Sequence, residues 1–255
     1  MISVKNLSFS YGKKALFENL NINLQKGQFI SLLGPNGCGK STLLNLISGH
    51  LSPKLGSISI DGESVHRLGD IEKAKKFTFV RQHQGNVFPY LCMDYVLLGR
   101  RPYKSSFEDF TDEDFTAAQG AMEKARVLDF AGNHLHELSG GELQRVVFAK
   151  ALAQHTQYIF LDEPFSAMDI FYSIHCLGEL RKKVRDENAT VVCVMHDINL
   201  ALQCSDCVVL LDRGKVYSAG PAGDLLTPDS IRDVYGIQVD KINDRGFFIR
   251  EGGLL

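Results

Sequence analysis

The sequence predicts an α/β protein built on a mixed, partly parallel sheet. An apolar run at 28–33 leads directly into a glycine-rich loop and then into a helical pattern. In the second half of the chain, strand-like and helix-like segments alternate, which is typical of βαβ units with parallel strands. These segments lie at 158–162, 170–185, 190–195, 197–204 and 207–212. Residues 2–60 are mostly strand-like, which predicts a further antiparallel layer.

The composition favours one globular domain near the upper end of the usual size. The chain has 255 residues, of which 44% are hydrophobic, so it can bury a substantial core. Its net charge of −2 gives no electrostatic reason to expect a nucleic-acid partner. No secretion signal opens the sequence, and its apolar runs are too short to cross a bilayer. We therefore expect a cytoplasmic protein whose six cysteines are reduced, with no zinc at the single pair Cys204 and Cys207.

The remaining elements follow from local patterns. Strands are expected at 2–9, 18–24, 28–33 and 57–61, and Asp61-Gly62 is a turn signal. Helical spacing appears at 93–101 and 112–131, with a break at 101–103. Near the C-terminus, Thr227 and Pro228 predict an N-cap and first turn for a helix that ends at 234–236. Two strands, 238–242 and 246–250, should flank a turn at Asn243-Asp244, and we expect this extension to serve packing.

A phosphate-binding loop is the strongest local signal. The residues Gly34, Pro35, Asn36, Gly37, Cys38, Gly39, Lys40 and Ser41 fit the pattern GxxxxGK[ST], and Thr42 opens the helix that follows. The glycines let backbone N–H groups face phosphate oxygens, Lys40 neutralises the β and γ phosphates, and Ser41 offers a hydroxyl to Mg²⁺. The alternative is an accidental glycine-rich turn. The preceding strand and following helix favour binding of ATP or GTP.

A second candidate site lies where the apolar run 158–161 reaches two acids. Ligands of open α/β sheets bind at the carboxyl ends of the strands, which is where Asp162 and Glu163 are expected. Asp162 is placed to hold Mg²⁺, and Glu163 to polarise the attacking water as general base. The alternative is that both acids simply cap the next helix. Their combination with the loop at 34–41 favours nucleotide hydrolysis.

Four further features bear on a possible site. Ser139, Gly140 and Gly141 begin an apolar-periodic helix, so a phosphate could approach its first N–H groups, or the serine could be a common N-cap. His196 ends the strand 190–195, and Gln82 follows the strand 77–80, so both are expected at the same sheet edge. Tyr11, beside Gly12, could be only an exposed turn residue.

In this order, the motifs resemble the ATP-binding subunits of ABC transporters, and the resemblance extends over about residues 1–220. It implies an ABC-ATPase fold, with the ring of Tyr11 stacked on adenine and Gln82 reaching both Mg²⁺ and the membrane partner. It also implies that Ser139, Gly140 and Gly141 cap the γ-phosphate of ATP on the opposite subunit, while His196 contacts the γ-phosphate within its own. Residues 166–169, ending at Asp169, match the loop that links the two sites, with Met168 where leucine is commoner.

The resemblance also implies an organisation and a set of partners. The single domain 1–255 would comprise a nucleotide core with antiparallel β-subdomain (1–85 and 150–220), a helical subdomain (87–150) and a C-terminal extension (221–255). A homodimer would close around two ATP molecules and act on separate integral-membrane permease subunits. An extracytoplasmic substrate-binding protein would contribute indirectly, and the ATPase would lie peripherally on the cytoplasmic face of the membrane.

Cargo and alternatives rest on resemblance alone. Gly99-Arg100-x-Pro102 is similar to a segment of iron–siderophore, haem and cobalamin importers, a group that molybdate importers resemble, although residues 81–90 depart from the usual form. Other ABC importers or exporters remain alternatives. Mechanical ATPases need long coiled coils between Ser41 and Ser139, translation-associated proteins typically carry two such domains, and a scaffold would be expected to lose Glu163 or His196.

Cys38 lies inside the phosphate-binding loop. Helix N-termini lower thiol pKa values, so we expect Cys38 to be reactive. Thiol reagents should then slow ATP hydrolysis, and bound ATP should protect.

Overall fold

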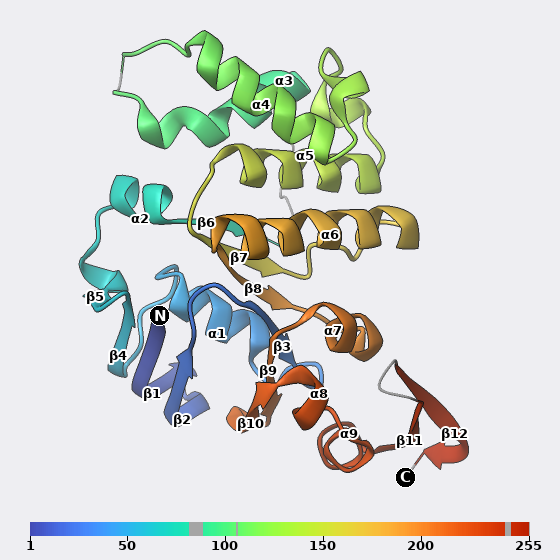
Figure 1. Ribbon diagram of the computed structural model, residues 1–255. Coiled ribbons are helices and arrows are strands. Elements are labelled where there is room, and N and C mark those ends of the chain that lie inside the picture. Colours follow the sequence, from blue (N-terminus) through green and yellow to red (C-terminus); the bar gives the residue numbers. More distant parts are fainter. Residues whose placement is uncertain (82–88, 106, 243–245, 255) are drawn as a thin grey trace. The chain divides into compact units, whose positions relative to one another are not determined.

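The computed structural model describes residues 1–81, 89–105, 107–242 and 246–254. The chain divides into two compact units, and each is considered by itself (Figure 1). The first unit comprises Met1–Leu68 and the chain from Thr190 onward, and the second comprises Gly69–Ala189.

An antiparallel layer opens the first unit. Its strands are β1 (Ile2–Tyr11), β2 (Lys14–Leu24), β4 (Leu55–Ile60) and β5 (Glu63–Ser64), in the order β2-β1-β4-β5. A short 3₁₀ turn, Val65–Arg67, follows. Strand β2 begins before the predicted residue 18, because Tyr11 pairs with Lys14 across a tight turn in which Gly12 has a φ of 56°.

A mixed sheet forms the centre of the first unit. Strand β3 (Phe29–Leu33) pairs in parallel with β8 (Thr190–Val194) and β9 (Cys207–Asp212), and every residue of β3 and β8 is buried. Strand β10 (Lys215–Pro221) runs antiparallel to β9 and was not predicted, because its pattern is polar. The helices α1 (Lys40–Ile47) and α7 (Ile198–Cys204) pack on this sheet.

The C-terminal part of the first unit contains α8 (Ala222–Leu225), α9 (Pro228–Tyr235) and a hairpin of β11 (Ile237–Ile242) and β12 (Gly246–Leu254). The predicted cap is confirmed, because the hydroxyl of Thr227 accepts the Ser230 N–H at 3.1 Å. The side chain of Asn199 on α7 bonds both backbone groups of Phe247, at 2.7 and 3.2 Å. This contact fixes the hairpin to α7. The predicted turn at Asn243-Asp244 lies outside the described residues.

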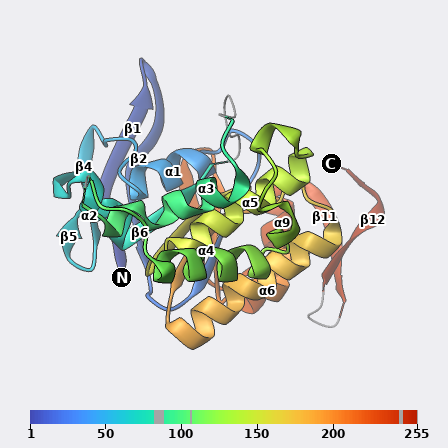
Figure 2. The same cartoon turned by 90° about the horizontal axis from the view of Figure 1, so that it is seen from above.

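The second unit combines a parallel strand pair with a helical layer. Strand β6 (Phe77–Val80) pairs with β7 (Tyr158–Asp162), and the flanking helices are α2 (Asp70–Lys76), which was not predicted, and α6 (Ile170–Glu187). The helices α3 (Cys92–Leu97), α4 (Asp112–Lys124) and α5 (Gly140–Ala153) pack against one another (Figure 2). Shorter 3₁₀ segments cover Leu98–Tyr103, Leu128–Phe130 and Leu135–Glu137.

Two helix ends differ from the prediction. Helix α4 stops at Lys124 rather than residue 131, because Arg126 adopts a left-handed φ of 55° and the Val127 N–H turns back to the Met122 carbonyl at 2.9 Å. The predicted helix 93–101 is shorter, because α3 ends at Leu97 and the chain continues as a 3₁₀ segment, Leu98–Tyr103, that includes Pro102. Its close packing requires Gly99, since a Cβ there would lie 2.6 Å from the carbonyl oxygen of Lys150.

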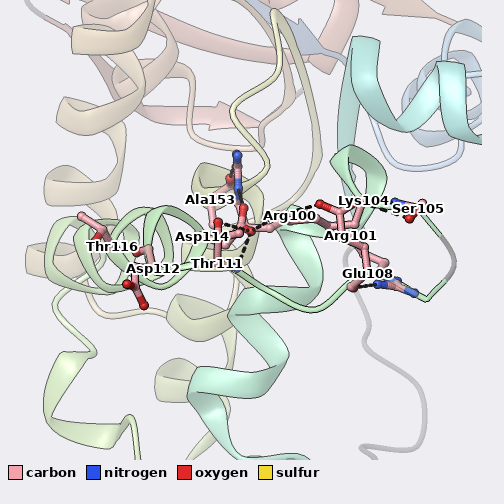
Figure 3. Close-up of polar contacts among 10 residues, drawn as sticks. All are labelled: Arg100, Arg101, Lys104, Ser105, Glu108, Thr111, Asp112, Asp114, Thr116 and Ala153. Carbon is pink, nitrogen blue, oxygen red and sulfur yellow. Dashed lines mark hydrogen bonds and ion pairs between the residues drawn. The ribbon is translucent and has the colours of Figure 1, made fainter.

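A buried ion cluster holds this helical layer together (Figure 3). The Asp114 carboxylate, 3% exposed, accepts from Arg100 Nε at 3.1 Å, from Lys104 Nζ at 2.7 Å, and from the backbone N–H and hydroxyl of Thr111 at 3.0 Å each. Burial by itself raises the pKa of Asp114, but these donors outweigh it and hold the pKa well below its usual value. Arg100 also donates to the Ala153 carbonyl at 3.1 Å, which joins the cluster to α5.

Within the described ranges, no helix combines the length and the apolar character needed to cross a membrane.

Candidate functional site

The P-loop, residues 34–41, joins β3 to α1 and is shaped by its neighbours. Gly34 and Gly39 have φ values of 146° and 110°, which side-chain-bearing residues rarely adopt. A Cβ on Gly34 would lie 2.1 Å from the Leu211 carbonyl oxygen, and one on Gly39 would lie 2.6 Å from the Phe17 ring. The Gly214 N–H also donates to the Cys38 carbonyl at 3.2 Å. The loop is therefore held by β2 and by the β9–β10 turn.

Lys40 places a positive charge inside this loop. Its side chain is 5% exposed, and Nζ donates to the carbonyl oxygens of Gly34 at 2.7 Å and Pro35 at 3.0 Å. Asn36 and Gly37 are exposed, and among the described residues no heavy atom beyond its chain neighbours lies within 4 Å of the position of a Cβ on Gly37. The loop therefore has an open side next to a buried ammonium group and the positive N-terminus of α1. These features fit an anionic phosphate chain.

Two more predicted residues belong to the first unit. Tyr11 is 56% exposed, its ring meets Phe9 edge-on, and its hydroxyl lies 3.3 Å from the hydroxyl of Thr42, at the start of α1. His196 is exposed and follows β8, whose pairing with the P-loop strand continues to the Met195 N–H, 3.2 Å from the Leu32 carbonyl. The fold thus brings Tyr11 close to the P-loop helix and His196 to the P-loop end of the sheet.

The acidic turn, residues 162–169, belongs to the second unit. Asp162 ends β7 and is 7% exposed. Glu163 has a φ of 49°, a left-handed conformation that is uncommon for a residue with a side chain. The next helix, α6, is capped by Asp169, whose carboxylate accepts the Tyr172 N–H at 3.0 Å. The alternative in which Asp162 and Glu163 cap this helix is therefore wrong.

The signature segment, Ser139–Gly141, begins α5 with a complete capping box. The Ser139 hydroxyl accepts the Glu142 N–H at 3.4 Å, while the Glu142 carboxylate accepts from the N–H and hydroxyl of Ser139 at 2.8 and 2.7 Å. Those two bonds to Ser139 lower the pKa of Glu142. Ser139 and Gly140 are exposed, and a Cβ on Gly141 would lie 2.8 Å from the Ala167 carbonyl oxygen. The backbone of the segment is therefore held by the capping box and by close packing at Gly141, while Ser139 and Gly140 remain accessible to solvent.

Residues 17–166 match the family model described as "ABC transporter". The chain belongs to the ABC transporter family. It is 34% identical to the hemin import ATP-binding protein HmuV of Escherichia coli O157:H7, over 96% of this chain and 95% of the relative. A solved structure described as an inward-facing ABC transporter of the metal-chelate type matches with a TM-score of 0.80 and 30% identity, over 96% of this chain and 94% of the other.

A third relative links the ABC fold to nucleotide chemistry. The dimeric ATP-binding cassette MJ0796, solved in a post-hydrolysis state with ADP and Pi, matches with a TM-score of 0.77 and 31% identity. The match covers 87% of this chain and 99% of the cassette. The predicted ABC-ATPase fold is therefore confirmed, and the chain is an ATP-binding, ATP-hydrolysing member of its family.

The expected lowering of the Cys38 thiol pKa in this ABC ATPase is wrong. Its side chain is only 4% exposed. Burial raises the pKa of the thiol and outweighs the opposing effects of Lys40, its charge first and its backbone N–H second. The helix N-terminus is therefore not enough to make this thiol reactive, and we expect slow modification in the folded protein.

Of the predicted site residues, Gln82 lies outside the described residues. Two residues with notable positions were missed. Gln144 on α5 is 8% exposed and bonds the acidic turn, and the hydroxyl of Tyr235 on α9 is buried close to Gly34. A buried glutamine in an apolar helix could have signalled the first. Nothing in the local sequence indicates the second, because its position depends on tertiary packing.

Proposed function

We propose that this ATPase works as a pair of identical copies that closes around two ATP molecules and drives import of a metal chelate through a separate membrane permease. In each site, the P-loop of one copy would hold ATP, and the signature segment of the other copy would cover the γ-phosphate. Hydrolysis would remove the contact that holds the pair closed. The ATPase would then lie against the membrane only through its permease.

The observation that carries this proposal is the exposed N-terminus of α5. Ser139 and Gly140 are open to solvent, although the helix beneath them is fixed by a capping box. A helix N-terminus with bare glycines favours an anion, and one supplied by a second copy would satisfy it. The dimeric state of the related cassette MJ0796 supports the same arrangement.

Roles for the other site residues follow from their chemistry. Lys40 would bind the β and γ phosphates, Tyr11 would stack on adenine, and Glu163 would act as general base toward the attacking water. His196 would contact the γ-phosphate, and Asp169 would communicate between the two sites. These roles remain proposals that mutagenesis can separate.

Mg²⁺ is the metal that these donors fit. Ser41 offers a hydroxyl and Asp162 a carboxylate, and Gln82 would contribute its amide oxygen; hard oxygen donors of this kind suit Mg²⁺ beside a triphosphate. The ion would neutralise charge on the phosphates, while Lys40 and the P-loop amides hold them in place.

The proposal for the cargo rests on similarity to proteins whose names state what they transport. The relatives named for hemin import and for metal-chelate transport are similar to this chain over nearly its full length. We therefore propose an iron–siderophore, haem, cobalamin or similar chelate, delivered by an extracytoplasmic binding protein. Uptake of radiolabelled iron chelates and cobalamin by a deletion strain tests this directly. Normal uptake of all of them, with loss of another solute, would reassign the cargo.

Replacing Glu163, the proposed general base, tests whether two copies of the chain close around ATP. The variant Glu163→Gln should bind ATP yet hydrolyse it at least a hundredfold more slowly, because the amide cannot accept the proton. ATP should then trap a dimer that light scattering detects. Glu123→Gln, an exposed position on α4, is the matched control and should behave as wild type. A Glu163→Gln protein that stays monomeric with saturating ATP would contradict the proposal.

A further inference from the structure

The side chain of Gln144 connects the signature helix to the acidic turn within one unit. It lies on α5 and is 8% exposed. Its Oε1 accepts the Ala167 N–H at 3.0 Å, and its Nε2 donates to the Glu163 carbonyl at 3.4 Å. One buried amide therefore holds both ends of the segment 163–167.

The orientation of this amide is fixed by its partners. A backbone N–H can only donate, so the Ala167 N–H requires the amide oxygen on its side. The amide nitrogen then faces the Glu163 carbonyl, which can only accept. No other pairing satisfies both backbone groups, so a residue that lacks either the donor or the acceptor loses one of these two hydrogen bonds. We call this pair of hydrogen bonds the Gln144 clamp.

The residue held in this way has an unusual backbone. Glu163 has a φ of 49°, and non-glycine residues persist in such conformations only where surrounding contacts enforce them. The Ser166 N–H, at 3.4 Å from the same carbonyl, and the close approach of Gly141 to the Ala167 carbonyl add further contacts. The direction of the Glu163 side chain depends on the backbone conformation at this residue, because a change of φ would rotate the carboxylate to a new position.

We propose that Gln144 is a positioning residue that sets the carboxylate of Glu163 for hydrolysis and connects it to the signature segment. Ser139 and Gln144 belong to the first turns of one helix, so movement at Ser139 reaches Glu163 through a hydrogen-bonded path. This inference rests on the proposed function, in which Ser139 serves the partner's ATP and Glu163 serves its own. Gln144 then links the two ATP sites of the pair.

The test compares two glutamines of the same helix. Gln144→Met removes the clamp while keeping the length of the side chain. Gln154→Met is the matched control, because Gln154 caps the other end of α5 and donates to the carbonyls of Ala74 at 2.6 Å and Phe77 at 3.2 Å. Both changes remove partly buried hydrogen bonds to backbone, so both should lower the melting temperature. Only Gln144 lies next to Glu163, the proposed general base.

We expect Gln144→Met to lower kcat for ATP about tenfold to a hundredfold, since small misplacements of a catalytic group cost that much. The KM for ATP should change less than about threefold, because the P-loop is untouched. Gln154→Met should leave kcat within about twofold of wild type at a temperature where both are folded. Equal kcat values for the two variants would overturn the proposal.

A second variant keeps the test informative if the methionine destabilises the fold. Gln144→Glu retains an acceptor for the Ala167 N–H but, when ionised, has no donor for the Glu163 carbonyl. Its kcat should therefore fall about as far as that of Gln144→Met, because the hydrogen bond to the Glu163 carbonyl is lost in both variants. Wild-type turnover by Gln144→Glu would count against the clamp.

Failure of this inference differs from failure of the proposed function. If Glu163→Gln retains near-normal turnover, the general base is wrong and both proposals fall. If Glu163→Gln abolishes turnover and traps the ATP-bound dimer, while Gln144→Met hydrolyses ATP normally, only the positioning role falls. In the Glu163→Gln background, adding Gln144→Met should cause no further loss of residual hydrolysis.

Discussion

The P-loop and the signature segment are both glycine-rich helix N-termini, yet they are held in different ways. The P-loop is enclosed by distant parts of its unit, since Leu211, Phe17 and Gly214 all contact its backbone. The signature segment is fixed mainly by its own capping box, and Ser139 stays exposed. In the proposed function, the P-loop holds ATP within its own copy and the signature segment completes the site of the partner copy. Binding and hydrolysis should therefore depend on different segments.

The largest effect should come from Lys40→Ala, which tests the enclosed region. The change removes a buried ammonium group from the P-loop, so ATP should bind much more weakly and turnover should fall at least about a hundredfold. Nucleotide affinity measured by fluorescence titration, together with phosphate release, reports both losses. Lys26→Ala, at an exposed position before β3, is the matched control. Unchanged ATPase activity would remove Lys40 from its proposed role.

Asp114→Asn tests whether the helical layer behind the signature segment is held by charge. Loss of the carboxylate leaves Lys104 and Arg100 without their buried anion, so stability should fall by roughly 2–3 kcal/mol at neutral pH. Because the pKa of Asp114 is depressed in the folded state, its contribution is present above the unfolded pKa and is lost as the pH falls further. The stability gap should therefore begin to narrow near pH 4 and should go on narrowing as the pH falls toward the folded pKa.

Urea unfolding of wild type and Asp114→Asn between pH 2.5 and pH 8 measures that gap. ATP affinity should be the same in both proteins wherever both are folded. A gap that stays constant down to pH 2.5 would show that hydrogen bonding, rather than charge, accounts for the effect.

Ser139→Ala sharpens the contrast between binding and hydrolysis. It should reduce kcat about tenfold, because the hydroxyl would no longer reach the partner's γ-phosphate, and it should leave ATP affinity of the single chain unchanged. The cap itself contributes only about 1 kcal/mol to stability. Thr227→Ala removes the analogous cap of α9 and is the matched control, with a similar loss of stability and no change in kcat. Weaker ATP binding by Ser139→Ala would show that the signature segment also contributes to nucleotide binding by the single chain, which contradicts the contrast.

The sequence predicted the features that depend on local chemistry. The capping residues Ser139 and Thr227 were found because serine and threonine hydroxyls accept N–H groups at helix starts. The buried strands β3, β7 and β8 were found because their residues are almost all apolar. The family also followed from the order of the motifs, and the match to the ABC transporter model confirms it.

What the sequence did not predict depends on contacts between distant segments. The pKa of Cys38 follows from burial rather than from its place at a helix N-terminus. The clamp by Gln144 requires the turn at 163–167 to face α5, which no local pattern reveals. Arg100 was noticed as part of a cargo-related motif, but its side chain supports the fold through Asp114 and the Ala153 carbonyl.

Tyr235→Phe should have the smallest effect and tests how tightly the C-terminal part encloses the P-loop. The Tyr235 hydroxyl is buried and, among the described residues, makes no hydrogen bond of normal geometry. Burial raises its pKa to about 12, although the nearby Gly34 N–H opposes this. Removing an unsatisfied buried hydroxyl should leave stability unchanged or raise it by up to about 1 kcal/mol, with the KM for ATP unaltered. A loss of stability greater than about 1 kcal/mol in urea unfolding would mean that the hydroxyl bonds the P-loop backbone, and that α9 supports the nucleotide site directly.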